Sequence, residues 1–469
     1  MRASKLLILS AAVIVMIGLA LAPRREAFDQ ITTSEESPLD IQLESALKQH
    51  GFTGNAEAQL ERRLGRKIDK RLTDVGRLLF FDPILSLSND SSCASCHSPT
   101  AGMSDTQSIA VGVGNNRVVG PGRAGPRNQR RAPSIINAAF YPNLMWDSRF
   151  SSVTGDPFDN SRGFRFPEPE GMTLSHLPHL LAAQAFIPVA ARAEMAGFAF
   201  EGDSFAIRFE LLNRLNGNKR YRKLFGKVFR EVKGGAPITY EMVGRAIAEF
   251  EFTLVFANAP IDRFARGERR AMTDDQKRGA LLFFGQANCV LCHAVSGPSN
   301  EMFSDFTQRV MGVPQIVPEN ANVEFNGPGK NEDFGLEQVT HNPEDRYKFR
   351  TAPLRNVGAQ AAFFHDGAFT TLEDAINHYR DVTRSARSLE DLKWKLPEDL
   401  RGPIGPVDPV LARVNPFLTR GVLLNEEEFR LLVEFVRNGL LDPRAKPENL
   451  RNLIPESVPS GLPLPQFQQ

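Results

Sequence analysis

The sequence has little cysteine and almost no net charge. Only 4 of its 469 residues are cysteines, which excludes a small scaffold held together by many disulfides. The 56 Lys and Arg residues nearly balance the 55 Asp and Glu residues, so a broad nucleic-acid-binding surface is not expected. Because 42 % of the residues are hydrophobic, the chain is not disordered, and its length predicts about two to four domains.

Long apolar runs are also scarce, with one exception at the N-terminus. A short basic segment precedes an apolar run from Leu6 to Ala22, which is slightly too short to span a hydrocarbon core as a straight helix. The run ends in the small-x-small form of a cleavage site, although Pro23 follows it directly. Residues 1–25 are therefore predicted to be an export signal, either cleaved or retained as an inner-membrane anchor, and the protein is predicted to be periplasmic.

The sequence also lacks the alternating pattern of long β-strands, and helical patterns predominate. One block, Leu-Leu-Phe-Phe, occurs at residues 78–81 and again at 281–284, and each copy precedes a cysteine-containing segment. Thr273–Gln276, before the second block, has the pattern of a capping box and predicts the start of a helix. The repeat predicts two related helical domains with a boundary near the glycines of residues 233–237.

All four cysteines fall into two copies of one motif, CASCH at Cys93–His97 and CVLCH at Cys289–His293. C-x-x-C-H is the attachment signature of c-type haem, because the two thiols form thioethers to the vinyl groups and the adjacent imidazole reaches the iron. One copy could equally be half of a zinc site or a redox dithiol, but two copies behind an export signal favour haem. The sequence therefore predicts two covalently bound haem c groups, attached through Cys93, Cys96, Cys289 and Cys292 and ligated by His97 and His293.

The scarcity of histidine and methionine after each motif limits which side chains can bind each iron opposite its histidine. No histidine lies between His97 and His176, so the first haem is expected to keep an open position for peroxide or oxygen. No methionine follows Met311, which excludes a downstream methionine ligand for the second haem. The candidates that remain there are His378, Tyr379 and His365, the last of which is expected to be structural.

These features resemble the bacterial dihaem cytochrome c peroxidase/MauG family. The resemblance covers most of the chain, from about Leu72 to Pro443, and implies a mainly α fold of two cytochrome c-like haem domains with long loops. The motifs that carry it are Leu79–Pro83, Ala132–Phe140, Met145–Arg149, Phe349–Val357 and Phe363–Gly367.

The resemblance also implies an organisation and a function. The expected segments are a signal or anchor (1–25), an N-terminal extension (26–70), a first, peroxidatic haem domain (71–235), a second, electron-transfer haem domain (236–445) and a C-terminal tail (446–469). The implied enzyme reduces hydrogen peroxide at the first haem. Its electrons come from a small cytochrome c or cupredoxin, or from a protein side chain that is oxidised, as in MauG. The alternative is a non-enzymatic dihaem electron-transfer cytochrome.

Four residues carry the family's functional positions. Trp146 matches the tryptophan between the haems that is implicated in electron transfer. Gln184, Pro188 and Glu194 match the residues over the open face of the first haem, and Glu194 is the family's candidate acid/base. Without the resemblance, Trp146 would be read as a core aromatic and Glu194 as a solvated charge.

The chain also departs from the standard peroxidase pattern. Val111–Gly114 stands where the family carries a regulatory histidine, so the first iron is expected to need no reductive activation. Tyr379 aligns with the axial methionine of the second haem, as in MauG-like members, with His378 as the rival ligand. A phenolate favours ferric and higher oxidation states, whereas a thioether favours ferrous iron. The family's calcium site takes an asparagine where this chain has Arg131, with Asn128 nearby, so calcium is left open.

Overall fold

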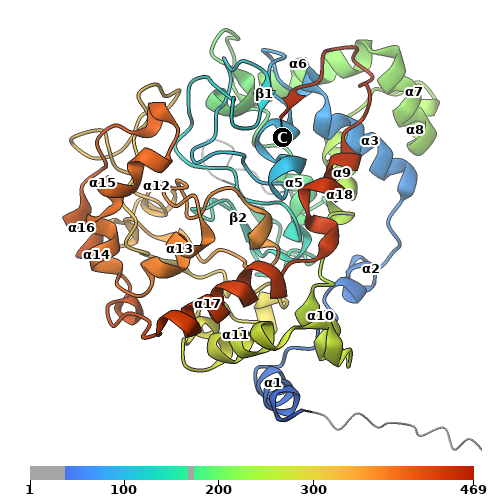
Figure 1. Ribbon diagram of the computed structural model, residues 1–469. Coiled ribbons are helices and arrows are strands. Elements are labelled where there is room, and N and C mark those ends of the chain that lie inside the picture. Colours follow the sequence, from blue (N-terminus) through green and yellow to red (C-terminus); the bar gives the residue numbers. More distant parts are fainter. Residues whose placement is uncertain (1–36, 167–173, 469) are drawn as a thin grey trace, which may run out of the picture. The chain divides into compact units, whose positions relative to one another are not determined.

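Short helices joined by long loops make up most of the computed structural model, which describes residues 37–166 and 174–468 (Figure 1). The expected export segment, residues 1–25, lies outside the described residues. The described residues from Pro38 onward belong to one compact unit. None of the helices in the described ranges is long and apolar enough to cross a bilayer.

The fold is mainly α, as expected from the sequence. The helices are α1 (Pro38–Gln49), α2 (Leu60–Leu64), α3 (Lys70–Phe81), α4 (Cys93–Cys96), α5 (Leu180–Gln184), α6 (Ser204–Gly217), α7 (Lys219–Val228), α8 (Arg230–Lys233), α9 (Tyr240–Phe252), α10 (Pro260–Ala265), α11 (Asp274–Phe284), α12 (Glu337–Thr340), α13 (Leu372–His378), α14 (Val382–Arg387), α15 (Leu389–Leu392), α16 (Val407–Leu411), α17 (Glu426–Glu434) and α18 (Pro447–Leu450).

The strands are short and form three small sheets. The antiparallel sheet β2–β3–β4 consists of Asn143–Leu144, Phe150–Ser152 and Phe164–Arg165. The other two sheets are the parallel pair β1 (Val118–Val119) with β7 (Gln466–Phe467) and the antiparallel pair β5 (Gln308–Arg309) with β6 (Phe349–Arg350). The turn between β2 and β3 carries residues 145–149, so this sheet positions the tryptophan motif.

Helix boundaries follow local capping chemistry. Thr273 and Gln276 form the expected capping box at the start of α11, because each side chain accepts a hydrogen bond from the other residue's backbone nitrogen at 3.2 Å. The Asp69 carboxylate caps α3 by accepting from the backbone nitrogen of Arg71 at 2.9 Å. Both Leu-Leu-Phe-Phe blocks lie at the ends of their helices, α3 and α11, as the repeat predicted.

The two halves of the chain repeat one helix pair. In the first half α3 packs on α9, and in the second α11 packs on α17. A Cβ atom at Gly76 in α3 would lie 1.8 Å from the carbonyl oxygen of Ala246, and one at Gly279 in α11 would lie 2.1 Å from that of Leu431. No side chain fits at either position, so the two backbones touch directly at each crossing.

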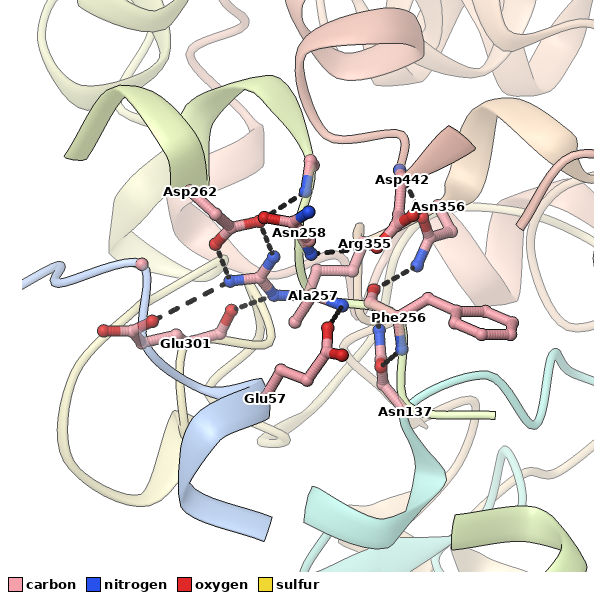
Figure 2. A network of polar contacts seen from close by, with 12 residues as sticks. Glu57, Asn137, Phe256, Ala257, Asn258, Asp262, Glu301, Arg355, Asn356 and Asp442 are labelled. Atoms are coloured by element: carbon pink, nitrogen blue, oxygen red, sulfur yellow. Dashed lines mark hydrogen bonds and ion pairs between the residues drawn. The ribbon is translucent and has the colours of Figure 1, made fainter. Parts of the chain in front are cut away.

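Two asparagines, one in each half of the chain, make the same kinds of hydrogen bond. Asn137 and Asn356 both have positive φ, at 65° and 60°. The side-chain oxygen of Asn137 accepts from the backbone nitrogen of Phe256 at 2.7 Å, and that of Asn356 accepts from the backbone nitrogen of Asp442 at 2.8 Å. Both side chains also donate to the Phe256 carbonyl, so they meet at one peptide (Figure 2). The segments that follow α9 and α17 are therefore joined to each other.

The first and last helices of the described chain pack against different halves of the molecule. Leu43 and Leu47 of α1 join the apolar core of α11, whereas Leu450 of α18 and Val458 join the core that contains Phe80 of α3. Helix α9 follows the expected boundary at residue 235, yet it packs on α3 and α5. We propose that the boundary between the two haem domains falls after α9.

Candidate functional site

A cavity of about 740 Å³ lies beside the first C-x-x-C-H motif. This volume lies within the range of about 300–1,000 Å³ that is usual for cofactor sites. Residues far apart in the sequence line it, and they include most of those expected from the sequence: Cys93, Cys96, His97, Trp146, Gln184, Pro188 and Glu194.

Helix α4 presents the first C-x-x-C-H motif to this cavity. The helix begins at Ser92, whose backbone nitrogen donates to the Ser95 hydroxyl at 3.0 Å. His97 ends it, and its Nδ1 lies 2.9 Å from the Pro133 carbonyl oxygen. A proton on Nδ1 leaves Nε2 free to bind a metal. Burial lowers the pKa of His97 to about 4, so the imidazole is neutral, as a metal ligand must be.

The second C-x-x-C-H motif has the same arrangement in the other half. A 3₁₀ turn at Cys289–Leu291 leads to His293, whose Nδ1 lies 2.9 Å from the Phe303 carbonyl oxygen. Burial lowers the pKa of His293 as well. All four cysteines are free thiols, and burial raises the pKa of Cys93, Cys96 and Cys289 to about 12. The four thiols form no disulfide, so each remains available for a thioether bond to haem.

The expected acid/base residue, Glu194, lies in a π-helical turn that lines the cavity. Gln184 ends α5, and Glu194 lies in a π-helical turn, Arg192–Ala196, which ends at Gly197 with a φ of 72°. Burial raises the pKa of Glu194, and the guanidinium of Arg149, whose Nη2 lies 3.4 Å from Glu194 Oε1, opposes that rise. Burial thus favours the neutral form of the carboxyl group, and Arg149 favours its ionised form.

Trp146 is fixed by hydrogen bonds on both sides. Its Nε1 donates to the Arg131 carbonyl oxygen at 3.0 Å, and its own carbonyl accepts from the backbone nitrogen of Arg350 at 2.8 Å. The preceding residue, Met145, has a φ of 66°, which turns the indole into the cavity wall. The two partners come from different halves of the chain, so Trp146 lies where the halves meet.

Three candidates for the second axial ligand differ in their hydrogen bonding. Both ring nitrogens of His378 are engaged, Nδ1 with the Ser385 hydroxyl at 2.9 Å and Nε2 with the Met311 carbonyl at 2.8 Å. His365 stacks on Phe349 and bonds Gln315. The Tyr379 hydroxyl has no hydrogen-bond partner among the described residues. Burial, and then Cys292 and Cys289, raise the pKa of this phenol, so Tyr379 lies near the second attachment site.

Haem fits the first cavity because several polar atoms in its wall lack partners. These buried atoms, unpaired within the described residues, are Asn128 Oδ1, Arg131 Nε, Arg149 Nε, Glu251 Oε2 and Arg350 Nε. Sequence reasoning missed the roles of Arg149, Glu251 and Arg350, although two of them stand in quoted motifs. Glu251 carried no sequence signal, since it is one glutamate within a helical pattern. The Arg131 guanidinium donates to Gln360 and Asp105, where calcium was left open.

Two C-x-x-C-H motifs, two repeated helix pairs and a cavity beside the first motif point to the class of dihaem proteins. A family model described as di-haem cytochrome c peroxidase matches residues 70–270. The methylamine utilization protein MauG of Methylorubrum extorquens is 32 % identical over 305 residues, which is 65 % of this chain and 67 % of MauG. The chain belongs to the dihaem cytochrome c peroxidase/MauG family, and it is a peroxidase-class oxidoreductase.

Other relatives agree with this family. The cytochrome c551 peroxidase of Pseudomonas aeruginosa is 28 % identical, over 66 % of this chain and 72 % of that protein. A MauG-like protein associated with microbial copper homeostasis has the same fold, with a TM-score of 0.57 and 22 % identity over 81 % of this chain and 91 % of that one. The dihaem peroxidase BthA of Burkholderia thailandensis has a TM-score of 0.55 and 24 % identity, over 84 % of this chain and 90 % of its own.

Proposed function

We propose that the protein reduces hydrogen peroxide at a haem attached through Cys93 and Cys96 and ligated by His97. One observation supports the proposal: His97, Gln184 and Glu194 line the same cavity, and burial raises the pKa of the Glu194 carboxyl group. Haem iron, when bound, supplies the redox centre that accepts oxidising equivalents from peroxide. The residues of the chain position the peroxide and move its protons.

Glu194 carries the proton transfer. Its carboxylate would accept a proton from bound peroxide and return it to the oxygen that leaves as water. Burial raises the pKa of this carboxyl group, and the Arg149 guanidinium, 3.4 Å from Glu194 Oε1, opposes that rise. Gln184 orients the peroxide by hydrogen bonding.

Trp146 links the two halves. Its indole lies in the wall of the first cavity, and its backbone is bonded to Arg350 of β6, in the half that carries the second attachment motif. We assign it the electron path between the two haem groups. Its hydrogen bonds hold the ring in one orientation, which fixes the distance that an electron must cross.

Tyr379 is the proposed axial ligand of the second haem. Its hydroxyl lacks a partner among the described residues, and it lies near Cys289 and Cys292. His378 is the weaker candidate because both of its nitrogens already bond within the chain. A phenolate at this position would suit a centre that stores oxidising equivalents.

The proposed partners follow from the chemistry. Electrons come from a small cytochrome c or cupredoxin, or from a protein side chain that becomes oxidised. Haem attachment through thioethers fits a periplasmic protein, and the N-terminal segment fits export. We do not extend the proposal to calcium, because the Arg131 guanidinium already supplies a positive charge at that position.

The test is a rapid-mixing measurement on the holoprotein with hydrogen peroxide, followed by haem absorbance. Replacing Glu194→Gln removes the proton acceptor but keeps the size of the side chain, so the peroxide reaction should slow by about 10²–10⁴-fold. The control is Glu201→Gln, an exposed glutamate of the same segment, which should react like the wild type. An unchanged rate in the Glu194 variant would remove the proton-transfer assignment.

A further inference from the structure

Two arginines in the first cavity are buried without a carboxylate partner. Arg131 and Arg350 expose only 2 % and 4 % of their surface, and neither forms an ion pair with any described residue. The Nε atom of each also lacks an acceptor. Burial lowers the pKa of both guanidinium groups to about 10, which shows that their charge is poorly compensated. An unpaired buried cation indicates a missing anion.

The contacts that these arginines do make are with neutral groups. Arg131 donates to the Gln360 side chain at 3.0 Å and to the Ser104 hydroxyl at 3.3 Å. Arg350 donates to the Asn143 carbonyl at 3.2 Å, and its guanidinium lies 5.5 Å from the ring centroid of Tyr141. None of these groups carries a full negative charge.

The other arginines of the cavity show the contrast. Arg130 is held by two carboxylates, Asp147 and Asp333. Arg149 lies beside Glu194, and Arg192 donates to backbone carbonyls at the rim. Arg131 and Arg350 are therefore the cavity arginines, within the described chain, whose charge is left for a bound group.

The two arginines occupy corresponding positions in the two halves of the repeat. Arg131 stands six residues before Asn137, and Arg350 stands six residues before Asn356 (137 − 131 = 356 − 350 = 6). Both are tied to Trp146, one through its indole nitrogen and the other through its carbonyl oxygen. The second half of the chain thus contributes Arg350 to a cavity that otherwise belongs to the first half.

We propose that Arg131 and Arg350 bind the two propionate carboxylates of the haem attached at Cys93 and Cys96. Two guanidinium groups then meet two carboxylates, and every unpaired arginine Nε of this pair gains an acceptor. Cys93 and Cys96 of α4 would hold the vinyl edge of the haem, and Arg131 and Arg350, both bonded to Trp146, would hold its propionates. The two arginines act as positioning residues, since they hold the haem edge against the indole.

The inference rests on the proposed haem attachment but not on the peroxide reaction, so it is tested without peroxide. The holoprotein is prepared with Arg350→Gln, Arg350→Lys and Arg131→Gln, and the covalent haem content of each variant is counted first. Resonance Raman spectra report the propionate bending vibrations, and a redox titration gives the midpoint potential of each haem. The control is Arg413→Gln, an exposed arginine outside the cavity.

Both glutamine variants should shift the propionate vibrations of the first haem and lower its midpoint potential, because a positive charge near the iron is lost. Arg350→Lys should give a smaller shift of the same sign, since it keeps the charge but not the planar fork. The control should match the wild type. The inference is overturned if the variants keep both haems with an unshifted first centre, or if only the second centre shifts. A Glu194→Gln result does not affect either outcome.

Discussion

Arg149 and Glu194 form an ion pair in the wall of the cavity, with Arg149 Nη2 3.4 Å from Glu194 Oε1. Burial raises the pKa of Glu194 and Arg149 lowers it. Replacing Arg149→Gln should therefore raise the pKa of Glu194 further, which leaves less of the carboxylate form below that pKa. We expect the acidic limb of the peroxide-reaction profile to move to higher pH, with about a tenfold loss of rate for each pKa unit.

The measurement is the rate of the peroxide reaction between pH 5 and 9. Arg149→Lys keeps a positive charge beside Glu194 and should keep most of the wild-type profile. A glutamine variant with the same profile as the wild type would show that Arg149 does not control this carboxyl group.

Glu251 is a buried carboxyl group of α9 with one unpaired oxygen. Burial raises its pKa from the ordinary value of 4.5 to about 8. A pKa raised by folding adds stability that is complete below pH 4.5 and is lost as pH rises through 8. Replacing Glu251→Gln removes that loss, so the variant should gain stability over the wild type progressively across this range. Thermal unfolding at pH 4.5, 6.5 and 8.5 measures the difference.

A matched control is Glu231→Gln, at an exposed position of α8. Its offset from the wild type should be the same at all three pH values. A constant offset for the Glu251 variant as well would mean that this carboxyl group is ionised in the folded protein throughout.

At this scale the sequence predicted the residues that belong to linear motifs. The cysteines and histidines of both C-x-x-C-H motifs need only adjacency to be recognised, and their attachment of haem stays a prediction. Arg350 and Glu251 could not be assigned, because their roles depend on which cavity their side chains enter. That information comes from the packing of α9 and β6, which lie far from α4 in the sequence.

The crossing of α3 and α9 depends on a single missing side chain. A methyl group at position 76 would lie 1.8 Å from the Ala246 carbonyl oxygen, so Gly76→Ala must force the helices apart. Overpacking of this kind costs about 1–3 kcal/mol. We expect a lower denaturant midpoint for the holoprotein and a disturbed absorbance of the first haem.

The control is Gly217→Ala at the end of α6, where nothing lies within 4 Å of the added methyl group. Alanine is a better helix former than glycine, so this variant should be as stable as the wild type or slightly more stable. Equal stability of the Gly76 variant would contradict a direct contact between the two backbones.

The helices themselves were largely predictable, because caps such as Thr273 and apolar repeats such as Leu-Leu-Phe-Phe are local. Their pairing was not. The packing of α9 on α3 joins residues 170 positions apart (246 − 76), and no local pattern encodes it. For this reason the expected domain boundary preceded α9, while the contacts of α9 favour a boundary after it.

A fully buried ion pair stabilises the second half of the molecule. Arg355, from the second half, bonds both carboxylate oxygens of Asp262 in α10 at 2.7 and 2.8 Å, and both side chains are fully buried (Figure 2). Replacing Arg355→Met leaves the buried Asp262 carboxylate without a cation, which should cost about 3–5 kcal/mol of unfolding free energy. Chemical unfolding followed by circular dichroism measures this loss.

The double variant Arg355→Met with Asp262→Leu tests whether the loss of stability comes from an unpaired buried charge. It removes both charges, so most of the lost stability should return. If the double variant is as unstable as the single one, the pair contributes through its geometry and not through a buried unpaired charge.

The proposed function implies two haem centres that differ in their coordination. A haem held by His97 would keep an open position beside Glu194, whereas a haem held by His293 would take Tyr379 as its second protein ligand. Low-temperature electron paramagnetic resonance of the oxidised holoprotein reports both at once. The account predicts one high-spin and one low-spin ferric signal in equal amounts, whereas two low-spin signals would contradict it.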